Sequence, residues 1–190
     1  DYNVTVSLDD SSVTAMAAAS HTGEVYGDAY AVANAIDVDS DQHAIISLTD
    51  STATAMAVAT TVGGEFGAES WGMEVYAGDL VDISLENSTV SALATGSGAY
   101  GYAVAVGIGI ERGCCDDDMS TVTLDNSAIT ASAIADGTYG DYAVAVGIGV
   151  QGNAVITLTN GSSISATTSN DGGQDGFGII AQGGGYYGYS

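Results

Sequence analysis

The residues best placed to do chemistry are carboxylates at short, regular spacing. Asp37, Asp39 and Asp41 occupy every second position of one segment, which is the spacing of the first ligands in many calcium loops. The match is partial, because Gln42 stands where an EF-hand has glycine and Leu48 where it has its last glutamate. The segment therefore predicts either a calcium site or a solvated acidic turn, and no other cofactor is expected.

The two cysteines, Cys114 and Cys115, are adjacent. One neighbouring pair without a second pair does not match the spacing of zinc sites. A vicinal disulfide, a disulfide to another subunit and free thiols all remain open, and either disulfide is favoured over inert thiols. The two histidines, His21 and His43, have no cysteine near them, and we expect both at the surface.

Composition excludes several classes of partner and reaction. The 190 residues include 24 Asp or Glu, one Arg and no Lys, for a formal net charge of -23. Nucleic acids and anionic membrane surfaces need a cationic face, so neither is expected to bind. No apolar run approaches the roughly 18 residues that span a membrane. Lyases acting on acidic polysaccharides need cationic groups, and no nucleophile-elbow motif is present. We expect no enzyme and no catalytic residues.

The chain repeats itself five times. Each copy has an aliphatic residue, Ser or Thr, Leu, any residue, Asp or Asn, and then Ser or Gly. The shared leucines are Leu8, Leu48, Leu85, Leu124 and Leu158. The apolar alternation has the period of a strand, and Asp or Asn before Ser or Gly is typical of turns. A second motif lies between the copies, an aromatic residue and Gly followed by alternating apolar residues.

A single strand–turn–strand unit cannot bury its apolar side, whereas stacked copies can. The sequence therefore predicts one all-β domain over residues 1–190, a parallel β-solenoid of about ten coils with two coils per repeat. At roughly 4.8 Å per strand the rod would be about 45–50 Å long. The predicted repeats are residues 4–43, 44–80, 81–119, 120–153 and 154–182, followed by a Gly/Tyr tail at 183–190.

The repeat pattern, Ile-Ser/Thr-Leu-x-Asp/Asn-Ser followed by Tyr-Gly and alternating Ala and Val, resembles the passenger repeats of bacterial autotransporter adhesins and related surface β-helix proteins. The likeness covers nearly the whole chain. It implies a right-handed β-helix that is secreted and displayed on, or shed from, a Gram-negative cell surface.

The ends of such a rod would leave strand edges that can pair with further strands. Head-to-tail stacking of copies does not close on itself and so gives a filament. We therefore expect an extracellular structural or adhesive protein whose main partner is itself. The expected contact residues are Tyr2, Phe177, Tyr186, Tyr187 and Tyr189. The alternative is a tail that packs back on its own rod.

Two other functions remain open. A non-polymerising adhesin or glycan-binding module would use aromatic platforms at Tyr30, Trp71, Tyr76 and Tyr102. It needs several of these side chains exposed together beside polar groups, and aligning Trp71 with Val144 instead favours a core position for Trp71.

Ice binding is the less favoured alternative, and it depends on two columns of hydroxyl side chains. The columns are Ser7, Ser47, Ser84, Thr123 and Thr157, and Thr14, Thr54, Ser91, Thr130 and Ser165. If each repeat makes two coils, only every second coil carries these hydroxyl side chains, so both columns would be interrupted.

Overall fold

The computed structural model describes residues 3–23, 27–112, 119–170 and 173–182. In these residues the chain forms only strands and turns, and fifteen strands make three parallel five-stranded sheets. Sheet A contains β1 (Val4–Asp9), β4 (His43–Thr49), β7 (Leu80–Glu86), β10 (Met119–Asp125) and β13 (Asn153–Thr159). Sheet B contains β2 (Ser12–His21), β5 (Thr52–Thr61), β8 (Thr89–Gly98), β11 (Ala128–Gly137) and β14 (Ser163–Ser169). Sheet C contains β3 (Ala29–Ser40), β6 (Glu65–Ala77), β9 (Tyr100–Arg112), β12 (Asp141–Gln151) and β15 (Gly173–Gln182).

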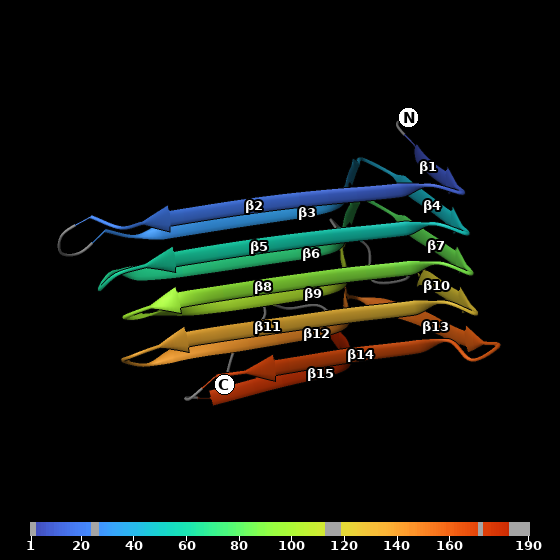
Figure 1. The fold of residues 1–190 in the computed structure, drawn as a ribbon. Coiled ribbons are helices and arrows are strands. Elements are labelled where there is room, and N and C mark those ends of the chain that lie inside the picture. Colours follow the sequence, from blue (N-terminus) through green and yellow to red (C-terminus); the bar gives the residue numbers. More distant parts are fainter. Residues whose placement is uncertain (1–2, 24–26, 113–118, 171–172, 183–190) are drawn as a thin grey trace.

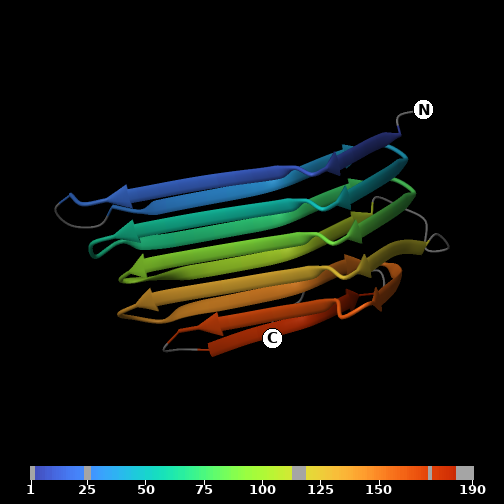
Figure 2. The ribbon, with the colours of Figure 1, turned by 45° about the vertical axis from the view of Figure 1, so that its right-hand side comes forward.

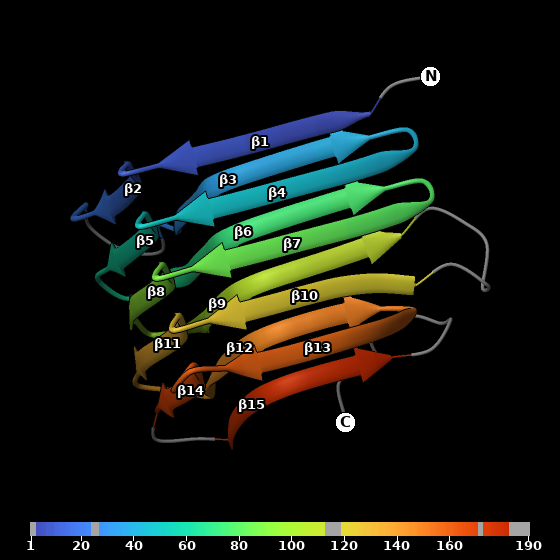
Figure 3. The ribbon, with the colours of Figure 1, turned by 90° about the vertical axis from the view of Figure 1, so that its right-hand side faces the viewer.

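The predicted parallel β-solenoid is confirmed, but the number of coils is wrong. Each repeat forms one coil of three strands, and each strand pairs with its equivalent in the next repeat. From the first repeat to the fifth the chain therefore makes about four turns. Figures 1 and 2 show these coils stacked one above another, and Figure 3 shows sheet A as one of the stacks. Four strand spacings of about 4.8 Å give a stack of about 19 Å.

The difference arises at the junction between the two motifs of each repeat. β2 and β3 belong to the two motifs that the sequence assigns to separate, adjacent coils, yet they form no ladder with each other. They belong to different sheets and pack face to face through their side chains. Each motif therefore pairs only with copies of itself, and the two motifs of a repeat lie on opposite sides of one core.

The corner between sheets A and B has the turn chemistry that the sequence predicts. One residue in each copy has a positive φ, between 45° and 52°: Asp10, Asp50, Asn87, Asn126 and Asn160. Asp and Asn tolerate this left-handed conformation better than other side chains. The serine that follows the turn residue forms hydrogen bonds within its own turn and to the serine of the neighbouring coil. Ser51 Oγ donates to the Thr49 carbonyl at 2.7 Å and accepts from the Ser11 N–H at 3.0 Å.

The core has two parts with different side chains. Between sheet A and the second half of sheet C it consists of large aliphatic residues such as Leu48 and Ile83. Between sheet B and the first half of sheet C it is almost entirely alanine, as at Ala57 and Ala94, with Phe66 as the one large side chain in that described cluster. Alanine lets the two sheets approach closely, so this half of the solenoid is thin.

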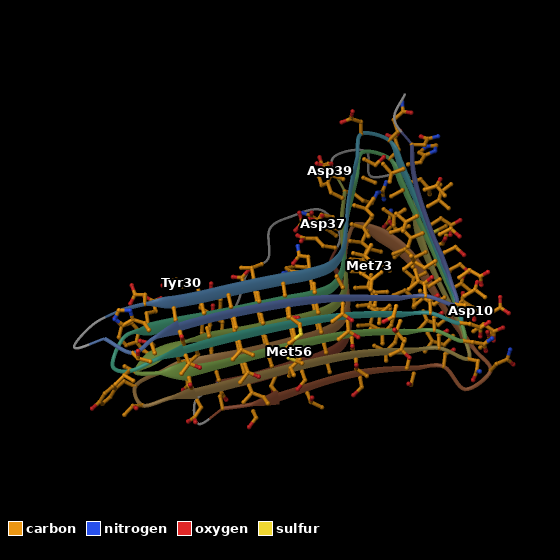
Figure 4. All side chains as sticks on the ribbon, turned by 45° about the horizontal axis from the view of Figure 1, so that its top comes forward. Asp10, Tyr30, Asp37, Asp39, Met56 and Met73 are labelled. Atoms are coloured by element: carbon orange, nitrogen blue, oxygen red, sulfur yellow. The ribbon has the colours of Figure 1, made fainter. Side chains whose placement is uncertain are left out.

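Sheet C bends where these two parts meet. In β3 the inward residues have odd numbers up to Ala33 and even numbers from Ile36. Glycines occupy the bend in the following strands, and a Cβ on Gly72 would lie 2.7 Å from the Gly107 carbonyl oxygen. Figure 4 shows β3 running beside β2 and then turning up towards the sheet that contains β1. The outer side of sheet C is therefore concave.

Candidate functional site

We call the outer, concave side of sheet C the bend face. Its first column contains Tyr30, Gly67, Tyr102 and Tyr142, which are paired in register on β3, β6, β9 and β12. The rings of Tyr102 and Tyr142 are stacked, with centroids 5.5 Å apart and an interplanar angle of 18°. Tyr30 and Tyr142 are about half exposed.

Gly67 makes this row of tyrosines continuous. A Cβ at Gly67 would lie 2.6 Å from Tyr30 Cδ1 and 2.9 Å from Tyr102 Cζ. The two rings therefore cover the space above the glycine from either side, and three tyrosines form one aromatic surface across four strands. Tyr76 lies farther along β6, where it pairs with Asp39 and is 42% exposed, so it stands apart from this row.

Trp71 lies on the same face, which corrects the alignment predicted from sequence. Its register partners are Asn34 and Val106, so it aligns with Val146 and not with Val144, and it takes an outward position. The Trp71 side chain is half-buried, and a Cβ added to Gly109 would meet its ring. Trp71 also contacts a small valine cluster that is separate from both parts of the interior core. Its valines are Val104, Val106, Val144 and Val146.

Carboxylates lie among these aromatic groups. The Tyr102 hydroxyl donates to Glu69 Oε1 at 2.8 Å, and the Asn34 amide Nδ2 donates to Glu74 Oε2 at 2.6 Å. Burial, together with the carboxylates of Asp37 and Glu111, raises the pKa of Glu74 above its usual range. Each carboxylate keeps oxygen lone pairs that could accept further hydrogen bonds.

The hydroxyls of Tyr30 and Tyr102 are held in their protonated form. Burial and the hydrogen bond to Glu69 raise the pKa of Tyr102 well above its ordinary value. Partial burial, with Glu65 and Asp28 nearby, raises the pKa of Tyr30. These phenols therefore act at neutral pH as neutral donors on an apolar ring.

The bend face has the composition of a site for a neutral, hydroxyl-rich ligand. Aromatic rings supply flat apolar surface, and a few carboxylates and hydroxyls supply hydrogen bonds at fixed positions. The chain's one arginine, Arg112, uses its Nε to donate to the Asp79 carbonyl at 3.1 Å. With no lysine in the chain, the face has little with which to hold an anion.

The predicted calcium ligands are only partly brought together. Asp37 and Asp39 are exposed on the outer side of β3, on the upright arm in Figure 4, and Asp41 follows in the turn. In the described part of the chain no three or more His, Cys, Asp or Glu side chains gather as a metal site. Calcium binding stays a prediction.

Some of the other residues that the sequence analysis singled out lie among the described residues, and others lie outside them. Phe177 pairs in register with Val146 from its place on β15. His43 is partly exposed, as expected, with Nε2 3.9 Å from Asp79 Oδ2. The other predicted contact residues and the cysteine pair lie outside the described residues: Tyr2, Cys114, Cys115, Tyr186, Tyr187 and Tyr189.

Several residues of the bend face were not predicted from sequence. Glu69, Glu74 and Tyr142 are part of it. The signal that could have found Tyr142 is its match with Tyr102, since both precede the same Ala-Val-Ala-Val run. Glu69 pairs with Val32 and Val104, so the repeat pattern gave no signal for it, whereas Glu74 pairs with Asp37, which the sequence had singled out only as a calcium ligand.

Comparison with known proteins gave no match to a protein-family model, to a curated protein or to a solved structure. The likeness to autotransporter passengers therefore stays a likeness of repeat pattern. The described strands and turns include no helix long and apolar enough to cross a membrane.

Proposed function

We propose that this protein is an extracellular adhesive β-solenoid that binds a neutral glycan on the bend face. The observation that carries the proposal is the Tyr102–Tyr142 stack, with Glu69 bonded to the Tyr102 hydroxyl. Trp71 lies on the same concave face, four residues farther along the strands, about 13 Å from the tyrosine column. Glycan binding requires several exposed aromatic groups beside polar groups. The tyrosine row and the carboxylates of the bend face are groups of these two kinds.

Sugar chemistry fits this face for two reasons. The apolar faces of sugar rings stack on aromatic rings, and sugar hydroxyls donate to carboxylates. The formal charge of -23 disfavours anionic ligands such as uronic acid polymers, because they would meet a surface of the same sign. Neutral oligosaccharides avoid this repulsion. The function proposed is binding without catalysis.

Trp71 is the only tryptophan, so its emission reports on the site directly. The experiment titrates the protein with neutral hexasaccharides of several linkages and with an oligogalacturonate. We expect saturable emission changes with at least one neutral ligand and none with the anionic one. Saturable binding of the oligogalacturonate alone would contradict the proposal, as would no response to any neutral ligand.

Two tyrosine variants provide a matched test. Tyr142→Ala removes half of the stacked pair and should weaken binding about tenfold, equivalent to about 1.4 kcal/mol. Tyr139→Ala removes a tyrosine that is 74% exposed in the turn before β12, outside the bend face, and should leave affinity unchanged. Equal losses in the two variants would show that the bend face is not the binding surface.

One observation favours ice binding as a second candidate. Because each repeat is a single coil, the hydroxyl columns run through every coil, which corrects the predicted interruption. On sheet B, Thr52 Oγ1 donates to Ser12 Oγ at 3.0 Å, and Ser91 Oγ donates to Thr54 Oγ1 at 3.1 Å. Thermal hysteresis tests this function. Thr54→Tyr should abolish hysteresis, Ile45→Tyr on sheet A should not, and a wild-type protein without hysteresis would exclude it.

A further inference from the structure

The first coil, formed by β1, β2 and β3, carries core positions that are incompletely covered. Val6 and Leu8 are half-buried, whereas their register partners Ile46 and Leu48 are 1% and 0% exposed. No described strand pairs with the outer edge of β1. This coil therefore resembles an interior coil with one neighbour missing from the described structure.

The last coil shows the same feature at its aliphatic core positions. Leu158 is 41% exposed, although Leu124 in the same column is fully buried. Ile179 is 48% exposed, although its partner Ile148 is also fully buried. Both occupy inward columns, so they are exposed because no described strand follows β13 or β15 in the stack.

The serine ladder has a free acceptor at the first coil. The Oγ atoms of Ser51, Ser88 and Ser127 each accept an N–H from the serine of the preceding coil, at 3.0 Å in all three cases. Ser11 Oγ donates to the Asp9 carbonyl, and no described residue donates to it. A further coil of the regular kind placed on β1 would supply the missing donor, whereas in the last coil the equivalent Ser162 N–H already donates to the Thr159 carbonyl at 3.1 Å.

The alanine half of the last coil is more polar than the rest. Thr168 pairs with Ala133, so a polar residue replaces alanine in this core column. Contact at this end would therefore depend on the aliphatic half between sheets A and C.

We infer that the last coil of one molecule stacks on the first coil of another, in the register that relates the repeats. Following the register pairs along sheet A places Ile156 opposite Val6 and Leu158 opposite Leu8 of the second molecule. The contact joins two different surfaces, so it propagates into a filament. It goes beyond glycan binding and does not depend on it.

Charge should make this association depend on salt. Each molecule carries a formal charge of -23, so two molecules repel at low ionic strength. Salt shortens the Debye length from about 30 Å at 0.01 M to about 8 Å at 0.15 M. We expect filaments to lengthen as salt rises.

Disulfide trapping tests the register. The same columns place Thr157 of one molecule opposite Ser7 of the next. The variant is Ser7→Cys with Thr157→Cys, with both native cysteines changed to serine. Within one molecule these two positions are four strand spacings apart, about 19 Å, which no disulfide can bridge. Oxidation should therefore give a ladder of linked multimers on a non-reducing gel.

The control pair is Ser7→Cys with Val155→Cys, which lies on the same face of β13 but is shifted by two residues. This shift adds about 6.6 Å along the strand, so linkage should be largely lost. Only monomers from the first pair, or equal ladders from both pairs, would overturn the proposed register.

A second, non-covalent test separates the contact from folding defects. Leu158→Asp places a charge at the proposed contact, whereas Val155→Asp places the same charge at a 44% exposed outward position of the same strand. Sedimentation velocity at low and high salt should show association of the wild type and of Val155→Asp but not of Leu158→Asp. Far-UV circular dichroism checks that both variants fold. A wild type that stays monomeric at every salt concentration would overturn the inference.

Discussion

Two buried serines should respond in opposite directions to the same substitution. Ser88 is 2% exposed and belongs to the serine ladder. Its Oγ accepts from the Ser51 N–H at 3.0 Å and donates to the Glu86 carbonyl at 2.7 Å. Ser70 is fully buried in the alanine half of the core, and its Oγ has no hydrogen-bond partner among the described residues. Ser88→Ala should destabilise the protein, and Ser70→Ala should stabilise it.

The expected change in the free energy of unfolding depends on which buried polar groups each substitution leaves without a hydrogen-bond partner. The Glu86 carbonyl keeps a bond from the Asp50 N–H, so Ser88→Ala orphans only the Ser51 N–H, at a residue that is 1% exposed. An unsatisfied buried donor costs about 1–3 kcal/mol, and we expect a loss of about 2 kcal/mol. Ser70→Ala removes an unsatisfied hydroxyl from a column occupied by alanine in neighbouring strands, and we expect a gain of about 1 kcal/mol.

Thermal and urea unfolding measure both changes. At about 2–4 °C per kcal/mol for a chain of this size, Ser88→Ala should lower Tm by about 6 °C and Ser70→Ala should raise it by about 3 °C. Ser84→Ala, on the exposed side of β7, serves as the control and should change stability by less than about 0.5 kcal/mol. Equal destabilisation by the two buried substitutions would refute the hydrogen-bond assignments.

Three further predictions concern the bend face and charge. Burial and nearby carboxylates raise the pKa of Glu74 in the folded state, so its ionised form destabilises folding above that pKa and the cost disappears as pH falls through it. Glu74→Gln should therefore stabilise the protein at pH 7 in urea titrations, and the gain should vanish towards about pH 4. Gly109→Ala should displace the Trp71 ring and shift its emission, whereas Gly67→Ala, which meets only tyrosines, should not. Raising salt should increase Tm by screening the charge of -23, and a Tm independent of salt would contradict this.

The parallel solenoid could be predicted because the same residue types recur at equivalent positions of the five repeats. The five leucines that define the first motif pair in register along sheet A, and the Asp or Asn that follows each of them two residues later takes the left-handed turn. Period-two alternation and turn residues are local signals, so one sequence suffices to find them.

The number of strands per coil could not be predicted in the same way. Alternation shows that β2 and β3 are strands, but it does not show whether they pair through backbone bonds or pack through side chains. The bend in sheet C also reverses which residues of β3 face inward beyond Ala35. This change of phase is why aligning Trp71 by apolar pattern placed it in the core.

The central claim is that one repeat makes one coil, so that equivalent residues of consecutive repeats are direct neighbours. Ser47 and Ser84 test it, because they are register partners on β4 and β7. In the variant Ser47→Cys with Ser84→Cys, with the native cysteines replaced by serine, we predict a quantitative intramolecular disulfide in the folded protein. With two coils per repeat the two positions would be about 10 Å apart. Thiols that stay reduced under oxidising conditions would therefore contradict this claim.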